Sequence, residues 1–106
     1  MLAPVIVFAY NRPNHLCKTL TWLGQNVLAD QTVLFVFCDG PKPEASEEQL
    51  EKIRKTRSVA HELAVAPTFK EVYFVERNEN FGLGTSIISG VTEIIQMYGK
   101  VIVLED

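Results

Sequence analysis

Two acidic residues, Glu105 and Asp106, directly follow the apolar run 101–104 (VIVL). A run of this composition predicts a buried strand. In α/β proteins, ligands bind in the crevice beyond the carboxyl ends of the strands, where carboxylates can hold a divalent cation or a sugar hydroxyl. Because successive side chains of a strand point in opposite directions, one acid could reach a hydroxyl while the other faces a cation. Adjacent acids are also often solvated, so the pair alone leaves both interpretations open.

A third carboxylate, Asp39, follows the apolar run 33–38 and precedes Gly40 and Pro41. Its side chain could accept an N–H from a nucleotide base or a hydroxyl from a ribose. Asp, Gly and Pro are also typical turn residues, because an aspartate carboxylate can bond nearby backbone N–H groups. The three residues alone therefore predict either a turn or a ligand contact.

Two loops contain residues suited to an anion. Segment 77–84 (RNENFGLG) precedes a helical pattern, and its glycines would let the backbone approach a phosphate beside a helix start. It lacks the third glycine of the dinucleotide fingerprint and follows the third predicted strand instead of the first, and the chain has no Gly-Lys-Ser/Thr of a P-loop. Arg12, before Pro13, could likewise place a guanidinium at a helix start. A tight turn and a solvated arginine are the alternatives.

Four apolar runs alternate with three helical patterns along the chain. The predicted strands cover residues 5–9, 33–38, 71–76 and 101–104. The first predicted helix covers residues 13–26. The second is a charged segment that begins with the capping-box pattern 46–49 (SEEQ), and we expect it to fray or kink near Ser58. The third ends at Gly99. This order predicts an α/β fold of three layers, in which a mostly parallel, Rossmann-like sheet of four strands carries helices on both faces. The carboxyl ends of parallel strands share one edge, which would carry residues 10–12, 39–40, 77–84 and 105–106.

The composition limits the classes of protein to which the chain can belong. Its 106 residues suit a single domain, and 47% hydrophobic with 22% charged residues is ordinary globular composition. The net charge of −3 gives no general reason to bind nucleic acid or an anionic membrane. The apolar start lacks a basic flank and is interrupted by Pro4, so it predicts a strand and neither a signal peptide nor a membrane span. Cys17 and Cys38 have no metal-binding spacing, and we expect two reduced, buried thiols in a cytoplasmic protein.

Four segments in a fixed order resemble a known family. They are PVIVFAYNRPNHLCKTL, an apolar strand ending in CDG, Arg77-x-x-Asn80-x-Gly82 before a helix, and VIVLED. Together they are similar to the N-terminal, nucleotide-binding half of glycosyltransferases with the GT-A fold, such as inverting family-2-like enzymes. The similarity is strongest to the N-acetylglucosaminyltransferases that act on glycoprotein mannose, whose fourth strand runs into Glu-Asp-Asp. The resemblance covers nearly the whole chain.

The resemblance implies an activity and a set of site residues. Such enzymes transfer a sugar from a nucleoside diphosphate, usually UDP, to an acceptor hydroxyl of a saccharide or glycan with the help of Mn²⁺ or Mg²⁺. A divalent cation stabilises the negative charge of the leaving diphosphate if carboxylates hold it in place. The residues implied to bind the nucleotide are Ala9, Tyr10, Arg12, Asp39, Asn80, Gly82 and Gly84, with Asp39 receiving the N–H of the uracil ring. Glu105 and Asp106 would be the first two acids of the metal motif.

Two departures from the family pattern change what we expect of the chain. Ile87 stands where many relatives carry an arginine close to the diphosphate. The sequence also finishes before the third acid, which is the direct metal ligand in the family, and before the half that holds the general base. Residues 1–106 are therefore expected to be a donor-binding fragment that is inactive alone, with a full-length protein that could lie at the cytoplasmic face of a membrane.

The sequence leaves two alternative functions open and makes one further prediction about the edge of the sheet. A stand-alone α/β nucleotide-binding or interaction module without catalysis is the main alternative function. A Rossmann-type NAD domain is disfavoured, because Asn11, Arg12 and Pro13 stand where its glycines would be needed. If later segments normally cover the fourth strand, its exposed edge also predicts self-association.

Overall fold

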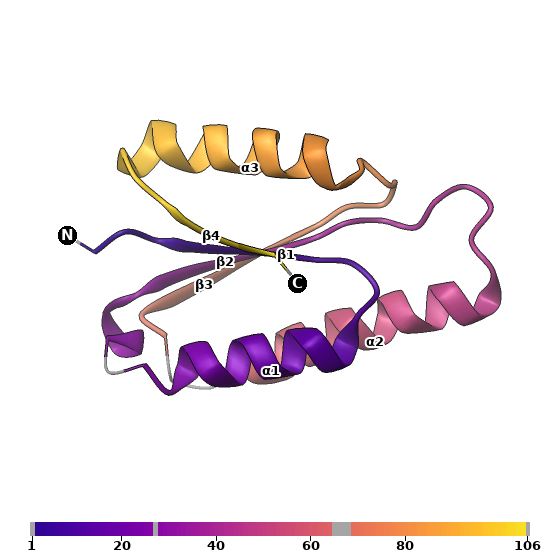
Figure 1. Cartoon of the computed structure of the whole chain (residues 1–106), viewed down its shortest axis with the longest axis horizontal. Helices are drawn as coiled ribbons and strands as arrows, with labels where there is room; N and C mark the ends of the chain where they lie inside the picture. The colour runs from indigo at the N-terminus through magenta and orange to yellow at the C-terminus, as the bar shows by residue number, and fades with distance from the viewer. Residues whose placement is uncertain (1, 27, 65–68, 106) are drawn as a thin grey trace.

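Strand β1 (Val5–Ala9) lies inside a sheet of four parallel strands. The computed structural model describes residues 2–26, 28–64 and 69–105 (Figure 1). Strands β2 (Val33–Cys38) and β4 (Ile102–Glu105) flank β1, and β3 (Glu71–Glu76) pairs with the other side of β2. The strand order is β3-β2-β1-β4, so β3 and β4 form the two edges. The predicted parallel sheet is confirmed.

Three helices complete a three-layer fold. Helices α1 (Pro13–Gly24) and α2 (Glu47–Ala64) cover one face of the sheet, and α3 (Leu83–Tyr98) covers the other (Figure 1). This arrangement confirms the predicted Rossmann-like α/β class. Each strand-to-strand connection crosses through a helix, as parallel pairing requires.

The helix limits agree closely with the sequence patterns, with two differences. Helix α1 ends at Gly24, two residues before the predicted limit, and a short 3₁₀ turn (Ala29–Gln31) precedes β2. Helix α2 runs without interruption through Ser58, where we expected fraying or a kink. At its start the capping box is formed, because Gln49 N–H donates to Ser46 Oγ at 3.2 Å and Ser46 N–H donates to Gln49 Oε1 at 3.1 Å.

Alternate residues of β1 and β2 supply two separate hydrophobic clusters. Strand side chains alternate between faces, and both faces of these strands are covered by helices. The cluster under α1 and α2 includes Val5, Val7, Leu16, Leu20, Leu34, Val36 and Ala60. The cluster under α3 comprises Ile6, Phe8, Phe35, Phe37 and Ile94. A Cβ on Gly90 would lie 3.0 Å from the Phe8 ring and 3.1 Å from the Phe37 ring, so this glycine allows α3 to approach the sheet closely.

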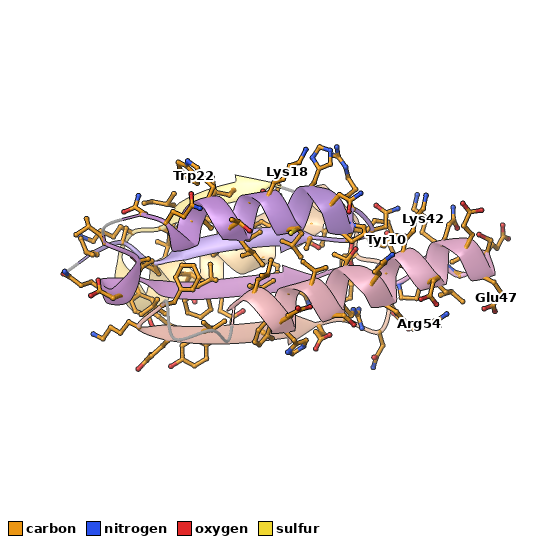
Figure 2. The ribbon with its side chains drawn as sticks, turned by 90° about the horizontal axis from the view of Figure 1, so that it is seen from below. Tyr10, Lys18, Trp22, Lys42, Glu47 and Arg54 are labelled. Atoms are coloured by element: carbon orange, nitrogen blue, oxygen red, sulfur yellow. The ribbon has the colours of Figure 1, made fainter. Side chains whose placement is uncertain are left out.

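The surface differs from the sequence-based expectation at one cysteine. Cys38 is buried at the end of β2, whereas Cys17 is exposed on α1, and no disulfide joins them. The prediction of two buried thiols is wrong for Cys17 because Leu16 and Leu20 turn the apolar face of α1 toward the sheet. Figure 2 shows Lys18 and Trp22 projecting outward from the same helix. Among the helices of the described ranges, none has the length and apolarity needed to cross a membrane.

Candidate functional site

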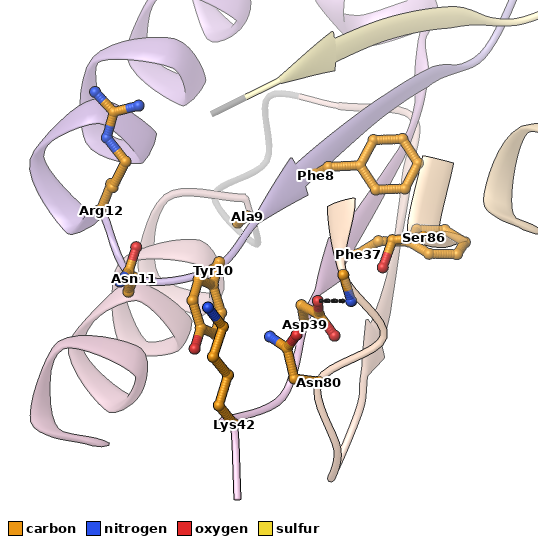
Figure 3. A pocket seen from close by; sticks show the side chains of 11 residues that line it. Phe8, Ala9, Tyr10, Asn11, Arg12, Phe37, Asp39, Lys42, Asn80 and Ser86 are labelled. Atoms are coloured by element: carbon orange, nitrogen blue, oxygen red, sulfur yellow. Dashed lines mark hydrogen bonds between the residues drawn. The ribbon is translucent and has the colours of Figure 1, made fainter. Parts of the chain in front are cut away.

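A pocket of about 320 Å³ opens at the carboxyl ends of β1 and β2 (Figure 3). Its lining comes from the end of β1 and the following turn, from the loop after β2, and from the start of α3. The lining residues are Phe8, Ala9, Tyr10, Asn11, Arg12, Phe37, Asp39, Lys42, Asn80, Gly82 and Ser86. The fold thus brings together all the nucleotide-binding candidates from the sequence except Gly84, which does not line this pocket.

Asp39 connects the end of β2 to the start of α3. Its Oδ1 accepts hydrogen bonds from the N–H groups of Gly40 at 2.9 Å and Phe81 at 2.8 Å. Its Oδ2 accepts a hydrogen bond from the Gly82 N–H at 3.1 Å (Figure 3). Hydrogen bonds to a charged acceptor are stronger than those between neutral groups. The Asp39 carboxylate thus bonds the next backbone N–H, as a turn aspartate can, and it also bonds the loop that precedes α3.

Gly40 and Asn80 hold the same two loops together. The Gly40 N–H donates to the Glu79 carbonyl at 3.2 Å, and the Asn80 side-chain amide donates to the Gly40 carbonyl at 3.0 Å. A Cβ on Gly40 would lie 2.5 Å from Glu79 N and O and 2.6 Å from the Arg77 carbonyl oxygen. Because backbone atoms occupy that space, this position requires glycine.

Arg12 and Lys42 supply positive charge at the pocket. The Arg12 guanidinium is exposed, lies 2.7 Å from His15 Nε2, and is turned away from Asp39 (Figure 3). The Lys42 side chain extends toward Tyr10 (Figure 3). Lys42 is a pocket residue that was not among the sequence candidates, although its place in the loop directly after β2 puts it at the shared edge.

The first turn of α3 presents a buried hydroxyl to the pocket. Gly82 precedes the helix with a φ of 79°, and none of the described side chains caps this helix start. Ser86 is only 3% exposed, and its Oγ has no hydrogen-bond partner among the described residues. A buried polar atom without a partner is costly unless a ligand or water satisfies it. Ser86 is thus a candidate ligand contact for which the sequence offered no specific signal.

The structure leaves the proposed acidic cluster largely untested. Glu105 ends β4, and its backbone is in register with Phe8, so it lies at the same edge of the sheet as the pocket. Oxygen ligands at this edge suit Mn²⁺ or Mg²⁺. Asp106 and the side chain of Glu105 lie outside the described residues. Within the described ranges, no group of three or more His, Cys, Asp or Glu side chains could hold a metal ion.

Comparisons with protein-family models, with curated proteins and with solved structures found no match. The pocket, and the order of the sequence segments that build it, are therefore the features that bear on function.

Proposed function

We propose that the chain is the donor-binding part of a glycosyltransferase, which moves a sugar from UDP to an acceptor hydroxyl of a saccharide or glycan. The observation that supports this most directly is the shared pocket of Tyr10, Arg12, Asp39, Asn80 and Gly82. These residues come from three separate loops, and the resemblance to GT-A enzymes assigns each of them to the nucleotide. The position beyond the strand ends is where open α/β sheets bind ligands.

The inner part of the pocket suits a nucleobase. Phe8 and Phe37 provide apolar aromatic surface, with ring centroids 5.5 Å apart. Asp39 Oδ2 accepts one described hydrogen bond, so it retains capacity for the ring N–H of uracil. The Ser86 hydroxyl can donate to a base carbonyl, which would satisfy an otherwise unpaired buried group.

The outer part of the pocket suits a diphosphate. Lys42 and Arg12 line it, and the N–H groups at the start of α3 contribute a partial positive charge. This local positive charge is needed to bind an anion, because the chain as a whole has a net charge of −3. Helix α3 offers no cation of its own at Ile87, so Lys42 takes the place of the arginine found in the resembling enzymes.

The metal and the remaining catalytic groups complete this proposal. Mn²⁺ or Mg²⁺, held in part by Glu105 and Asp106, would stabilise the charge of the departing diphosphate. Nothing in the pocket is assigned as a general base, so the chain binds the donor and is not expected to transfer sugar alone. We also propose a cytoplasmic location, because Cys17 and Cys38 do not form a disulfide.

Calorimetric titration with UDP in the presence of Mn²⁺ tests the proposal. We expect wild-type protein to bind UDP and to prefer it over ADP. We also expect methylation of the uracil ring nitrogen to weaken binding about tenfold, which is the loss of one hydrogen bond of about 1.4 kcal/mol. The D39N variant should lose this discrimination, whereas the matched control D30N, on the distant 3₁₀ turn, should retain it. Absence of UDP binding at millimolar concentration would contradict the proposal.

One feature favours an interaction module as the second candidate function. Apolar side chains are exposed near the amino ends of the strands, around a cavity of about 240 Å³. They include Leu2, Trp22, Leu28 and Ile102. A protein that failed to distinguish UDP from ADP, and that associated through these side chains, would fit this function better than donor binding.

A further inference from the structure

The guanidinium of Arg57, on α2, joins the two loops that form one wall of the pocket. Its Nη2 donates to the carbonyl oxygens of Asp39 at 3.2 Å and Arg77 at 2.6 Å. These carbonyls belong to the first residues after β2 and β3, where the hydrogen bonding of the sheet ends. A part-buried carbonyl at that position needs a donor, and one side chain supplies it to both strands.

The carboxylate of Glu76 holds Arg57 in place and is itself paired with His61. The Arg57 side chain is 24% exposed, and its Nε lies 3.6 Å from Glu76 Oε2. Glu76 Oε1 lies 2.9 Å from His61 Nε2, and the His61 ring stacks on Phe74 at a centroid distance of 4.0 Å. Glu76 therefore partly balances the guanidinium charge. Arg57 does not line the pocket, so it stands behind the loops that bind the proposed ligand.

Asp39 is consequently held from two directions. Arg57 binds its backbone carbonyl, while the N–H groups of Phe81 and Gly82 bind its carboxylate. Arg57 also binds the carbonyl of Arg77, at the start of the loop that carries those N–H groups. One guanidinium thus helps to set the separation of the two loops across which the Asp39 carboxylate is hydrogen-bonded.

We propose that Arg57 is a positioning residue for this pocket, which presets the Asp39 carboxylate and the loop 77–82 for the ligand without touching it. The role in ligand binding rests on the proposed function. Losing Arg57 leaves two part-buried carbonyl groups without their donor, so the loop 77–82 is held beside Asp39 less firmly, by its remaining hydrogen bonds alone. Preorganisation of this kind raises affinity because less ordering is required on binding.

Amide hydrogen exchange and UDP titration of R57Q, R57K and R54Q in the 106-residue chain test this role. Arg54 is a matched control, because it lies one turn earlier on α2 and pairs only with Glu51 among the contacts described. In R57Q we expect exchange at Phe81 and Gly82 to accelerate about tenfold, the equivalent of about 1.4 kcal/mol of local opening, and UDP affinity to fall by a similar factor. Val7 and Val36, in the core strands, should keep their protection.

The variants separate positioning from general stability. R57K should recover part of the protection and affinity, because an ammonium group can donate to the same carbonyls but lacks the planar fork. R54Q should behave as wild type. Unchanged exchange at Phe81 and Gly82 in R57Q would overturn the inference, and so would an equal acceleration at Val7 and Val36.

The test also distinguishes this inference from the proposed function. If wild-type protein bound no UDP while R57Q lost protection only at the loop, the proposed function would fail and the positioning of the loop would stand. If wild-type protein and R57Q bound UDP equally, the positioning role would fail while donor binding stood.

Discussion

The Gly82 N–H donates to Asp39 Oδ2 at 3.1 Å, although the two residues are 43 positions apart in the chain. This bond fastens the carboxyl end of β2 to the start of α3. Together with the Phe81 contact to Oδ1, it makes Asp39 part of the pocket wall. The shape of the pocket therefore depends on contacts between loops more than on either loop alone.

Substituting Gly40 by alanine should destabilise the fold and widen the pocket. The new Cβ would lie 2.5 Å from backbone atoms of Glu79, so the two loops must separate. We expect a loss of about 2 kcal/mol in the free energy of unfolding, measured by urea denaturation, as is usual for overpacking. Gly84→Ala is the control, because nothing lies within 4 Å of its Cβ and alanine favours a helix. Equal stability of the two variants would contradict the close loop contact.

Substituting Ser86 by alanine should lower the affinity for UDP without lowering the stability of the fold. Its hydroxyl is buried without a described partner, so its removal should leave the free energy of unfolding unchanged or raise it by about 1 kcal/mol. UDP affinity should fall about fivefold to tenfold if the hydroxyl serves the base, as one lost hydrogen bond predicts. Thermal unfolding and calorimetry measure the two effects. A destabilised variant with unaltered affinity would indicate a structural role for the hydroxyl.

Substituting Glu105 by glutamine should reduce the effect of metal on UDP binding. A neutral amide is a weaker ligand for Mn²⁺ or Mg²⁺ than a carboxylate. Titration of UDP with Mn²⁺ and with EDTA gives the metal-dependent part of the affinity, which we expect to be smaller in E105Q than in wild type. Affinity without metal should be similar in the two proteins. An unchanged metal dependence would remove Glu105 from the proposed metal site.

The edge strand β4 should mediate self-association at high protein concentration. Ile102 is 50% exposed and Val103 is 37% exposed, and β4 pairs with β1 on one side only among the described strands. A lysine at an edge strand opposes such pairing. We expect sedimentation to show concentration-dependent dimers of wild type and a monomer for I102K. T92K, on the exposed surface of α3, adds the same charge elsewhere and should still dimerise.

The sequence by itself determined the order of strands and helices along the chain, the parallel direction of the strands and the edge of the sheet at which the candidate residues meet. These features follow from local patterns, because an apolar run or a helical spacing is complete within a few residues. The capping box at Ser46 is of the same kind, and it forms as predicted. The predicted burial of Cys17 was wrong, because the packing of α1 decides which of its faces meets the sheet.

Only the tertiary structure decided the order of the strands within the sheet. It also decided the bonds of Asp39 to Phe81 and Gly82, the burial of the Ser86 hydroxyl without a described partner, and the contacts of Arg57. Each depends on groups that are distant in the chain and become neighbours only when particular strands pair. A lone arginine in a charged helix has the same local pattern whether it is solvated or binds two carbonyl groups. The physical reason is that a hydrogen bond is decided by distance and direction in space, which local spacing does not encode.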